Sequence, residues 1–167
     1  MRRLLVAGNW KMNGTLSSTE SLAAGVAAAA APHLSQVDVL VCPPAPYLVS
    51  VAGKLKGTGV ALGAQNCWYE PKGAFTGEVS NDMLLDIGCA YVLIGHSERR
   101  HVIRETDDLL NRKVRAALQK GLNVVLCVGE LPDERSSGKT EGVLDRQLET
   151  GLQGVEAGDL LRVEVGE

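Results

Sequence analysis

The sequence lacks several features that would assign a protein to a functional class at first sight. Its four cysteines, at positions 42, 67, 89 and 127, form no C-x-x-C pair, so we expect reduced thiols of the kind found in cytoplasmic proteins. Neither H-E-x-x-H nor G-x-S-x-G occurs, which disfavours a zinc protease and a serine hydrolase. His96 and His101 are five positions apart with no suitably spaced cysteine, and this spacing does not indicate a metal site.

Long apolar runs and an excess of positive charge are also missing. No apolar stretch approaches the roughly 20 residues of a membrane-spanning helix, and the apolar run at the start is too short for a signal peptide. A net charge of -3 and a pI near 5.7 give no general attraction to nucleic acid or to anionic membranes. We therefore expect a cytoplasmic protein that binds neither.

What the 167 residues do contain is a regular alternation of two patterns. Short runs rich in Val, Leu and Ile lack polar alternation, so we expect each to be a strand buried on both faces of a parallel sheet. Five segments of helical period separate them. The sequence thus predicts one α/β domain over residues 1–167 with six strands and five helical segments. The runs are Leu4–Ala7, Val37–Cys42, Val60–Ala64, Tyr91–Ile94, Leu122–Val128 and Leu160–Val165.

Several predicted helices have recognisable ends. Ser17 and Glu20 have the spacing of a capping box that opens an alanine-rich helix, which Pro32 stops. Ser80 is expected to cap a short helix through residue 87. Thr106 is expected to cap another that ends before Gly121.

Polar residues follow four of the predicted strands. They are Gly8–Gly14, Gln65 and Asn66, His96 with its neighbours, and Val128–Glu130. In parallel α/β folds, ligands bind at the carboxyl ends of the strands. This pattern is typical of an α/β enzyme.

Lys11 and His96 each allow two interpretations when taken alone. Lys11 is either a surface lysine or, bracketed by Trp10 and Met12, a cation directed at an anionic ligand. His96 is either structural or a ligand-binding residue beside Gly95 at the start of a helical turn. A helix N-terminus disfavours imidazolium, so His96 is expected to be neutral and able to donate a hydrogen bond to a carbonyl group.

Two further segments have both a functional and an ordinary interpretation. Glu98, Arg99 and Arg100 form either a solvated charge run or an ion pair that braces the His96 loop. Ser136–Gly142 has the end of a phosphate-binding P-loop, but Asp133 replaces the first glycine of that pattern. We interpret Gly138–Thr140 as an exposed loop that leads into the helix containing Leu144 and Leu148.

Five motifs together resemble the triose-phosphate isomerase family, in the family's order and across essentially residues 2–162. They are GNWKMNG at 8–14, GAQN at 63–66, GAFTGE at 73–78, IGHSERR at 94–100 and CVGE at 127–130. The resemblance implies a (β/α)₈ barrel that acts as a homodimer on a phosphorylated triose, interconverting dihydroxyacetone phosphate and glyceraldehyde 3-phosphate without a cofactor or metal.

The resemblance also implies roles for individual residues. Asn9 and Lys11 match substrate-binding positions, and His96 matches the electrophile that polarises the carbonyl. Around them, Glu98 matches an acid near Lys11, and Ser97, next to Glu98, matches a residue that supports the site. Cys127 matches a buried thiol near the catalytic base. Phe75 and Thr76, in the Gly73–Glu78 loop, match the segment that inserts into the neighbouring subunit.

Six strands are fewer than this fold requires. A closed barrel of this type has eight strands and typically ~250 residues. The sequence ends LLRVEVGE in or just after the sixth strand, where Glu164 and Glu167 match the family's general base poorly. We therefore expect a partial barrel that is inactive and poorly soluble when made alone. A non-catalytic partial barrel, serving as a binding or assembly module or completed by a partner polypeptide, remains the alternative.

Overall fold

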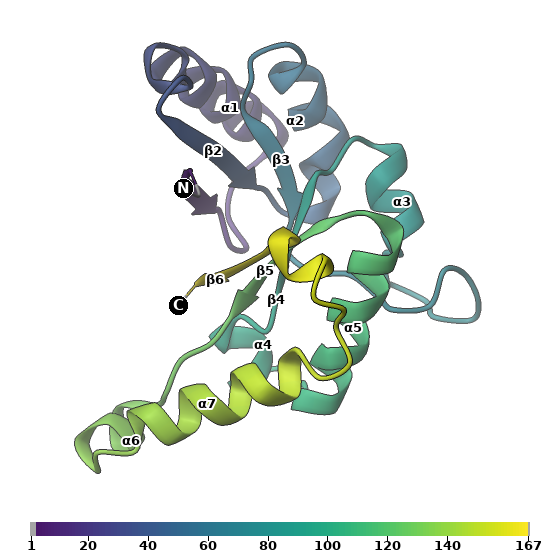
Figure 1. Ribbon diagram of the computed structural model, residues 1–167. Helices are drawn as coiled ribbons and strands as arrows, with labels where there is room; N and C mark the ends of the chain where they lie inside the picture. The colour runs from purple at the N-terminus through teal and green to yellow at the C-terminus, as the bar shows by residue number, and fades with distance from the viewer. Residues whose placement is uncertain (1–2, 167) are drawn as a thin grey trace.

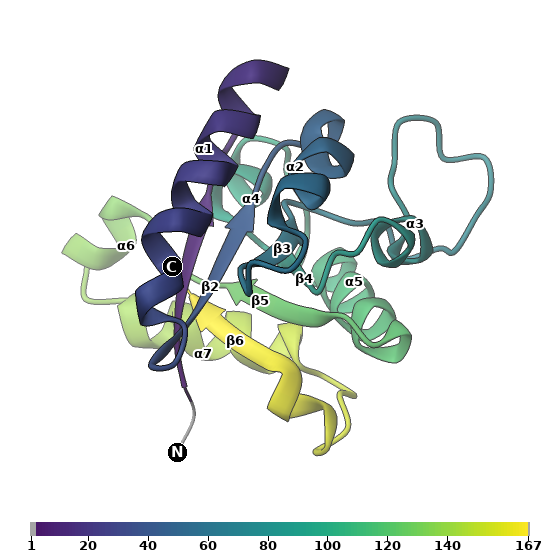
Figure 2. The same ribbon diagram turned by 90° about the horizontal axis from the view of Figure 1, so that it is seen from above.

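Six parallel strands curl into an open barrel wall with helices packed on its outer face (Figure 1, Figure 2). The computed structural model describes residues 3–166. The strand order follows the chain order, and each strand pairs in parallel with the next. This arrangement confirms the predicted incomplete α/β barrel. The strands are β1 (Leu4–Asn9), β2 (Val37–Cys42), β3 (Ala61–Ala64), β4 (Tyr91–Ile94), β5 (Asn123–Cys127) and β6 (Val163–Gly166).

Each of the five connections between strands is helical, as the sequence predicts. The last two connections contain two α-helices each, and three short 3₁₀ turns accompany the α-helices. No helix within residues 3–166 is long and apolar enough to cross a bilayer. The helices are α1 (Leu16–Ala30), α2 (Leu48–Leu55), α3 (Asn81–Asp86), α4 (Ser97–His101), α5 (Asp107–Lys120), α6 (Pro132–Ser136) and α7 (Thr140–Gly151).

The strands separate two apolar cores because successive side chains point to opposite faces. The larger core lies between the sheet and the helices, where Val92 and Val124 pack among residues such as Leu48 and Val114. The smaller core fills the inside of the curled sheet and contains Leu40, Cys42, Leu93, Val125 and Cys127. These two cores hold the carboxyl ends of β1, β4 and β5 in fixed positions.

The prediction that every strand is buried on both faces is wrong for the two outermost strands. Leu4 and Val6 of β1 are 74% and 57% exposed, and Val165 of β6 is 55% exposed. Within residues 3–166 each of these strands has a neighbour on one side only, so part of its outer face is uncovered. The sixth strand also begins later than predicted, because Leu160 lies in a 3₁₀ turn over Asp159–Arg162.

The helix ends follow the predictions with one exception. Ser80 and Thr106 cap α3 and α5, and Gly121 ends α5 with a left-handed backbone. The predicted Ser17–Glu20 capping box is wrong. The box is formed instead by Thr15 and Ser18, whose hydroxyls accept each other's backbone N–H at 3.3 and 2.8 Å.

Arg104 has a backbone conformation that residues other than glycine rarely adopt. Its φ is 68°, and a left-handed residue with a Cβ costs roughly 1–2 kcal/mol. We expect Arg104→Gly to raise the free energy of unfolding by about 1 kcal/mol, since the relief exceeds the extra entropy of glycine in the unfolded chain. Urea unfolding measures the change.

A glycine placed inside a helix serves as the control for this prediction. Arg112→Gly in α5 is expected to lower the free energy of unfolding by about 1 kcal/mol. A loss of stability in Arg104→Gly as large as that in Arg112→Gly contradicts the proposed strain at position 104.

Candidate functional site

Polar residues from the ends of β1, β3 and β4 line one cavity at the carboxyl edge of the sheet. Its volume is about 300 Å³. Asn9 comes from the last position of β1, Lys11 from the loop that follows, and His96 from the start of α4 directly after β4. The cavity, called the Lys11 cavity below, is lined by Asn9, Lys11, Met12, Gln65, His96, Glu98, Arg99 and Ile103.

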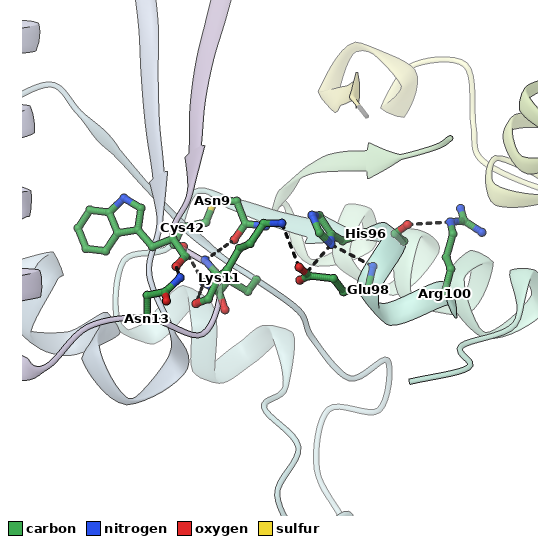
Figure 3. A network of polar contacts seen from close by, with 10 residues as sticks. Asn9, Lys11, Asn13, Cys42, His96, Glu98 and Arg100 are labelled. Atoms are coloured by element: carbon green, nitrogen blue, oxygen red, sulfur yellow. Dashed lines mark hydrogen bonds and ion pairs between the residues drawn. The ribbon is translucent and has the colours of Figure 1, made fainter. Parts of the chain in front are cut away.

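Lys11 is held in an unusual backbone conformation by two neighbours. Its φ is 53°, while the Asn9 side chain accepts its backbone N–H at 2.9 Å and the Gln65 amide donates to its carbonyl at 2.8 Å. Its Nζ lies 3.0 Å from Oε1 of Glu98 (Figure 3). Strain of this kind persists where the surroundings fix a functional geometry, and here it directs the ammonium group across the cavity.

His96 caps the N-terminus of α4 with its own side chain. Its Nδ1 accepts the backbone N–H of Glu98 at 3.3 Å and lies 3.5 Å from Oε2 of the same residue (Figure 3). A ring nitrogen that accepts a hydrogen bond carries no proton, so the neutral ring carries its proton on Nε2. His96 therefore offers a hydrogen-bond donor to a ligand in the Lys11 cavity.

Glu98 lies between these two residues. The hydrogen bond from Lys11, together with the positive charge of its ammonium, lowers the pKa of Glu98 against the opposing effect of desolvation. Glu98 is accordingly a carboxylate at neutral pH. Its structural role is to hold the ammonium of Lys11 and the loop of His96 in one arrangement.

The charged residues after His96 do not pair with one another. Arg99 donates to Glu105 from Nε and Nη2 at 2.8 and 2.6 Å, and Arg100 binds Asp107 and the carbonyl of Gly95. They therefore brace the His96 loop through Gly95 on its N-terminal side and through Glu105 and Asp107 further along the chain. The sequence left a solvated charge run and a bracing ion pair open as alternatives, and it did not indicate these partners.

A second cavity of about 300 Å³ adjoins the ends of β4 and β5. Ser97, Cys127 and Glu130 line it. Burial raises the pKa of the Cys127 thiol to about 11, so the thiol is neutral. Hydrogen bonds from Arg135 and Thr140, at 2.6 and 3.2 Å, help to lower the pKa of Glu130.

Comparison with known proteins assigns the chain to a family. A family model described as triosephosphate isomerase matches residues 4–165. The chain belongs to the triosephosphate isomerase family. It is 50% identical to the triosephosphate isomerase of Herpetosiphon aurantiacus over 165 residues, which cover 99% of this chain and 66% of that protein. For the triosephosphate isomerase of Aquifex aeolicus the identity is also 50%, over 93% of this chain and 62% of the relative.

A third relative extends the same picture. The triosephosphate isomerase of Treponema denticola is 46% identical, over 99% of this chain and 65% of that protein. The chain thus spans slightly less than two thirds of the length of these relatives.

The structure distributes the residues implied by the family resemblance over three places. Asn9, Lys11, His96 and Glu98 meet in the Lys11 cavity, whereas Ser97 and Cys127 line the neighbouring one.

Phe75 and Thr76 lie in neither cavity. Their Gly73–Glu78 loop belongs to the long β3–α3 connection that projects from the body (Figure 1). Phe75 packs against Trp68 with ring centroids 5.4 Å apart.

Sequence reasoning did not assign a role to three residues that hold the chain near the carboxyl edge of the sheet. Gln65, after β3, donates to the carbonyls of both Lys11 and Cys42. Gln147 clamps the peptide of Gly129 after β5, accepting its N–H at 2.9 Å and donating to its carbonyl at 3.1 Å. Lys113 is buried and donates to Asn66 and Glu105 at 2.8 and 2.7 Å.

The structure also describes the Lys139 segment, the cysteines and the groups that could bind a metal. Residues 140–151 form α7, with Lys139 at its N-cap, in keeping with a loop that leads into a helix. All four cysteines are buried free thiols. Within residues 3–166, no three His, Cys, Asp or Glu side chains are grouped so that they could hold a metal ion.

Proposed function

We propose that Asn9, Lys11 and His96 form the electrophilic and anion-binding part of a triosephosphate isomerase site. The reaction is the interconversion of dihydroxyacetone phosphate and D-glyceraldehyde 3-phosphate, a step of glycolysis and gluconeogenesis in the cytoplasm. One observation carries the proposal. The ammonium of Lys11 and the imidazole of His96, whose Nδ1 is occupied, border the same cavity at the ends of β1 and β4.

The chemistry follows from the charges that develop during proton transfer. Removing a proton from the carbon beside a carbonyl group places negative charge on the carbonyl oxygen and gives an enediolate. Nε2–H of His96 donates to that oxygen, and Lys11 offsets the charge of the enediolate and of the substrate phosphate. Fixed donors of this kind stabilise a transition state because they need no reorganisation as the charge appears. The scheme uses neither a metal ion nor a cofactor.

The general base belongs, in this proposal, to residues outside 3–166. Among the described residues that line the Lys11 cavity, Glu98 is the one carboxylate. Its ion pair with Lys11 lowers its pKa, which makes it a weak proton acceptor. Glu98 therefore serves to position Lys11 rather than to abstract the proton.

A complementation experiment tests the function and the placement of the base together. The 167-residue chain is mixed with a polypeptide covering the final third of the Herpetosiphon aurantiacus relative, and isomerisation is followed by proton NMR of the triose phosphates. We expect the mixture to isomerise and each polypeptide alone to be inactive, because electrophile and base then lie on different chains.

Each result of this experiment has a distinct meaning. Robust turnover by the 167-residue chain alone contradicts the external base. A mixture that forms a complex but does not isomerise contradicts the isomerase function and favours a non-catalytic binding or assembly module. A matched mixture containing Lys11→Met controls for contaminating isomerase.

The proposal includes a homodimer formed through the Gly73–Glu78 loop. The loop projects from the body (Figure 1), and exposed apolar side chains of Met12 and Ile103 border the Lys11 cavity. A partner loop seated there would cover these side chains.

Adding a charge to the loop tests this arrangement. We expect Thr76→Glu to weaken dimerisation at least tenfold in sedimentation equilibrium of the complemented protein, because the loop would carry an unpaired carboxylate into the interface. Ser136→Glu, on an exposed position of α6, is the control and leaves the dissociation constant unchanged. Equal dissociation constants for the two variants contradict the loop-mediated dimer.

A further inference from the structure

Arg100 joins four segments of the chain beside the candidate site (Figure 3). It belongs to α4, and its guanidinium donates from Nε to the carbonyl of Gly95 at 2.7 Å and from Nη2 to the carbonyl of Cys127 at 3.1 Å. The remaining nitrogen, Nη1, binds the carboxylate of Asp107 at the start of α5. The side chain is 7% exposed, so these contacts are largely withdrawn from water.

The contact with Gly95 acts directly on His96. The carbonyl of Gly95 and the backbone nitrogen of His96 belong to the same planar peptide unit, so a hydrogen bond that fixes one fixes the other. Gly95 has a left-handed backbone with φ of 82°. A Cβ at this position would lie 2.9 Å from Nη2 of Arg100 and 2.9 Å from the carbonyl oxygen of Cys127, which shows how closely the guanidinium is packed against the turn.

We propose that Arg100 is a positioning residue that sets the orientation of the His96 ring and holds it in register with the end of β5. The inference rests on the proposed function for its meaning, because it specifies how the electrophile of that site is aimed. The effect is transmitted through the backbone. The guanidinium fixes the Gly95–His96 peptide, and the peptide keeps Nδ1 of His96 on the N–H of Glu98 and Nε2 available to the cavity.

Arginine is required for this role because of its planar, forked shape. Three nitrogens of one rigid group reach two carbonyls and one carboxylate at the same time. A lysine ammonium is a single point on a flexible stem and does not reproduce that geometry. Arg100→Lys therefore retains the charge beside Asp107 but loses the simultaneous hold on Gly95 and Cys127.

The orientation of His96 is measurable without turnover. Magic-angle-spinning NMR of the sedimented, ¹⁵N-labelled 167-residue chain reports which imidazole nitrogen is protonated and which accepts a hydrogen bond, and His96→Gln assigns the signals. We expect the unmodified chain to show one neutral form with an accepting Nδ1. Arg100→Lys is expected to lose that signature and to show a second tautomer.

Two controls separate positioning from stability. Arg112→Lys changes an exposed arginine paired with Asp108, and we expect it to leave the His96 signals unchanged. Asp107→Asn weakens the ion pair of Arg100 but leaves both carbonyl contacts, so it is expected to lower the unfolding temperature and to keep the signature. Should Arg100→Lys not fold, Arg100→Ala measured with and without methylguanidinium replaces it, and the added guanidinium group is expected to restore the signature.

Unchanged His96 signals in Arg100→Lys, or an equal change in Asp107→Asn, overturn the proposal. The result is independent of the isomerase assay. A failed complementation rejects the proposed function without altering the imidazole signals, whereas unchanged signals reject the role of Arg100 even in an active enzyme. In the active complex Arg100→Lys is expected to lower kcat by about 10²-fold with KM little changed.

Discussion

Replacing Glu105 by glutamine is expected to lower the free energy of unfolding by about 3–5 kcal/mol. The Glu105 side chain is 5% exposed and binds Arg99 and Lys113, the latter with a side chain that is 1% exposed. Removing one partner of a buried ion pair leaves the other charge uncompensated, and that uncompensated charge rather than the lost bond dominates the cost. Lys113 is the charge that is left.

The effect depends on pH in a definite direction. Burial by itself raises the pKa of Glu105, but the hydrogen bonds and charges of Arg99 and Lys113 outweigh it and lower the pKa below its ordinary value. A lowered folded-state pKa contributes stability that is present above the unfolded pKa of about 4.3 and is lost as the pH falls through the folded value. The difference between the unmodified chain and Glu105→Gln is therefore expected to shrink in acid.

Urea unfolding at pH 7 and at pH 3 tests both the loss of stability and its dependence on pH. Asp108→Asn is the matched control, since it breaks the exposed pair with Arg112 and is expected to cost less than about 1 kcal/mol. A second variant, Glu105→Gln with Lys113→Met, removes the buried charge as well and is expected to recover part of the loss. A cost below about 1 kcal/mol for Glu105→Gln at pH 7 contradicts the buried-charge explanation.

Replacing His96 by glutamine is expected to lower kcat of the complemented enzyme by about 10²–10³-fold, the usual effect of removing one preorganised donor to a developing oxyanion. The Nε2 donor of His96 is fixed by the hydrogen bond from Glu98 to Nδ1. A glutamine amide lacks both this anchor and the ring that carries a proton between two neighbouring oxygens. KM is expected to change less, because the donor acts mainly in the transition state.

A histidine outside the Lys11 cavity provides the control for this measurement. His101 lies exposed at the end of the same helix, and His101→Gln is expected to retain kcat within about twofold, as surface substitutions usually do. Equal losses in the two variants contradict an electrophilic role for His96 and indicate a general effect on α4.

Local signals in the sequence were sufficient to predict most of the fold. Ser80, Thr106 and Gly121 mark helix ends by chemistry that acts within four residues. The capping box of α1 was misplaced because Thr15, Ser17 and Ser18 all offer a hydroxyl, and the direction in which the preceding loop enters the helix decides between them. The exposure of Leu4 and Val6 was not predictable from their apolar character, since it depends on which segments lie beside β1.

The site residues were predictable where they come directly after the end of a strand. Lys11 and His96 fall there, and the structure places both at one cavity. Partners distant in sequence were not predictable from residue type, as the contacts of Arg100 with Cys127 show. Lys113 did leave a signal that was not used, since it lies three positions after Leu110, on the buried stripe of α5.

The sheet order β1-β2-β3-β4-β5-β6 has a consequence for how the protein is made. Each new strand finds its pairing partner in the strand that left the ribosome just before it, so the nascent chain can assemble the wall in the order of synthesis without waiting for distant segments. The N-terminal segments of a chain leave the ribosome first during synthesis. The contact between Lys11 and Glu98, 87 positions apart, requires β1 and β4 but neither β5 nor β6, since every residue that lines the Lys11 cavity lies between positions 9 and 103.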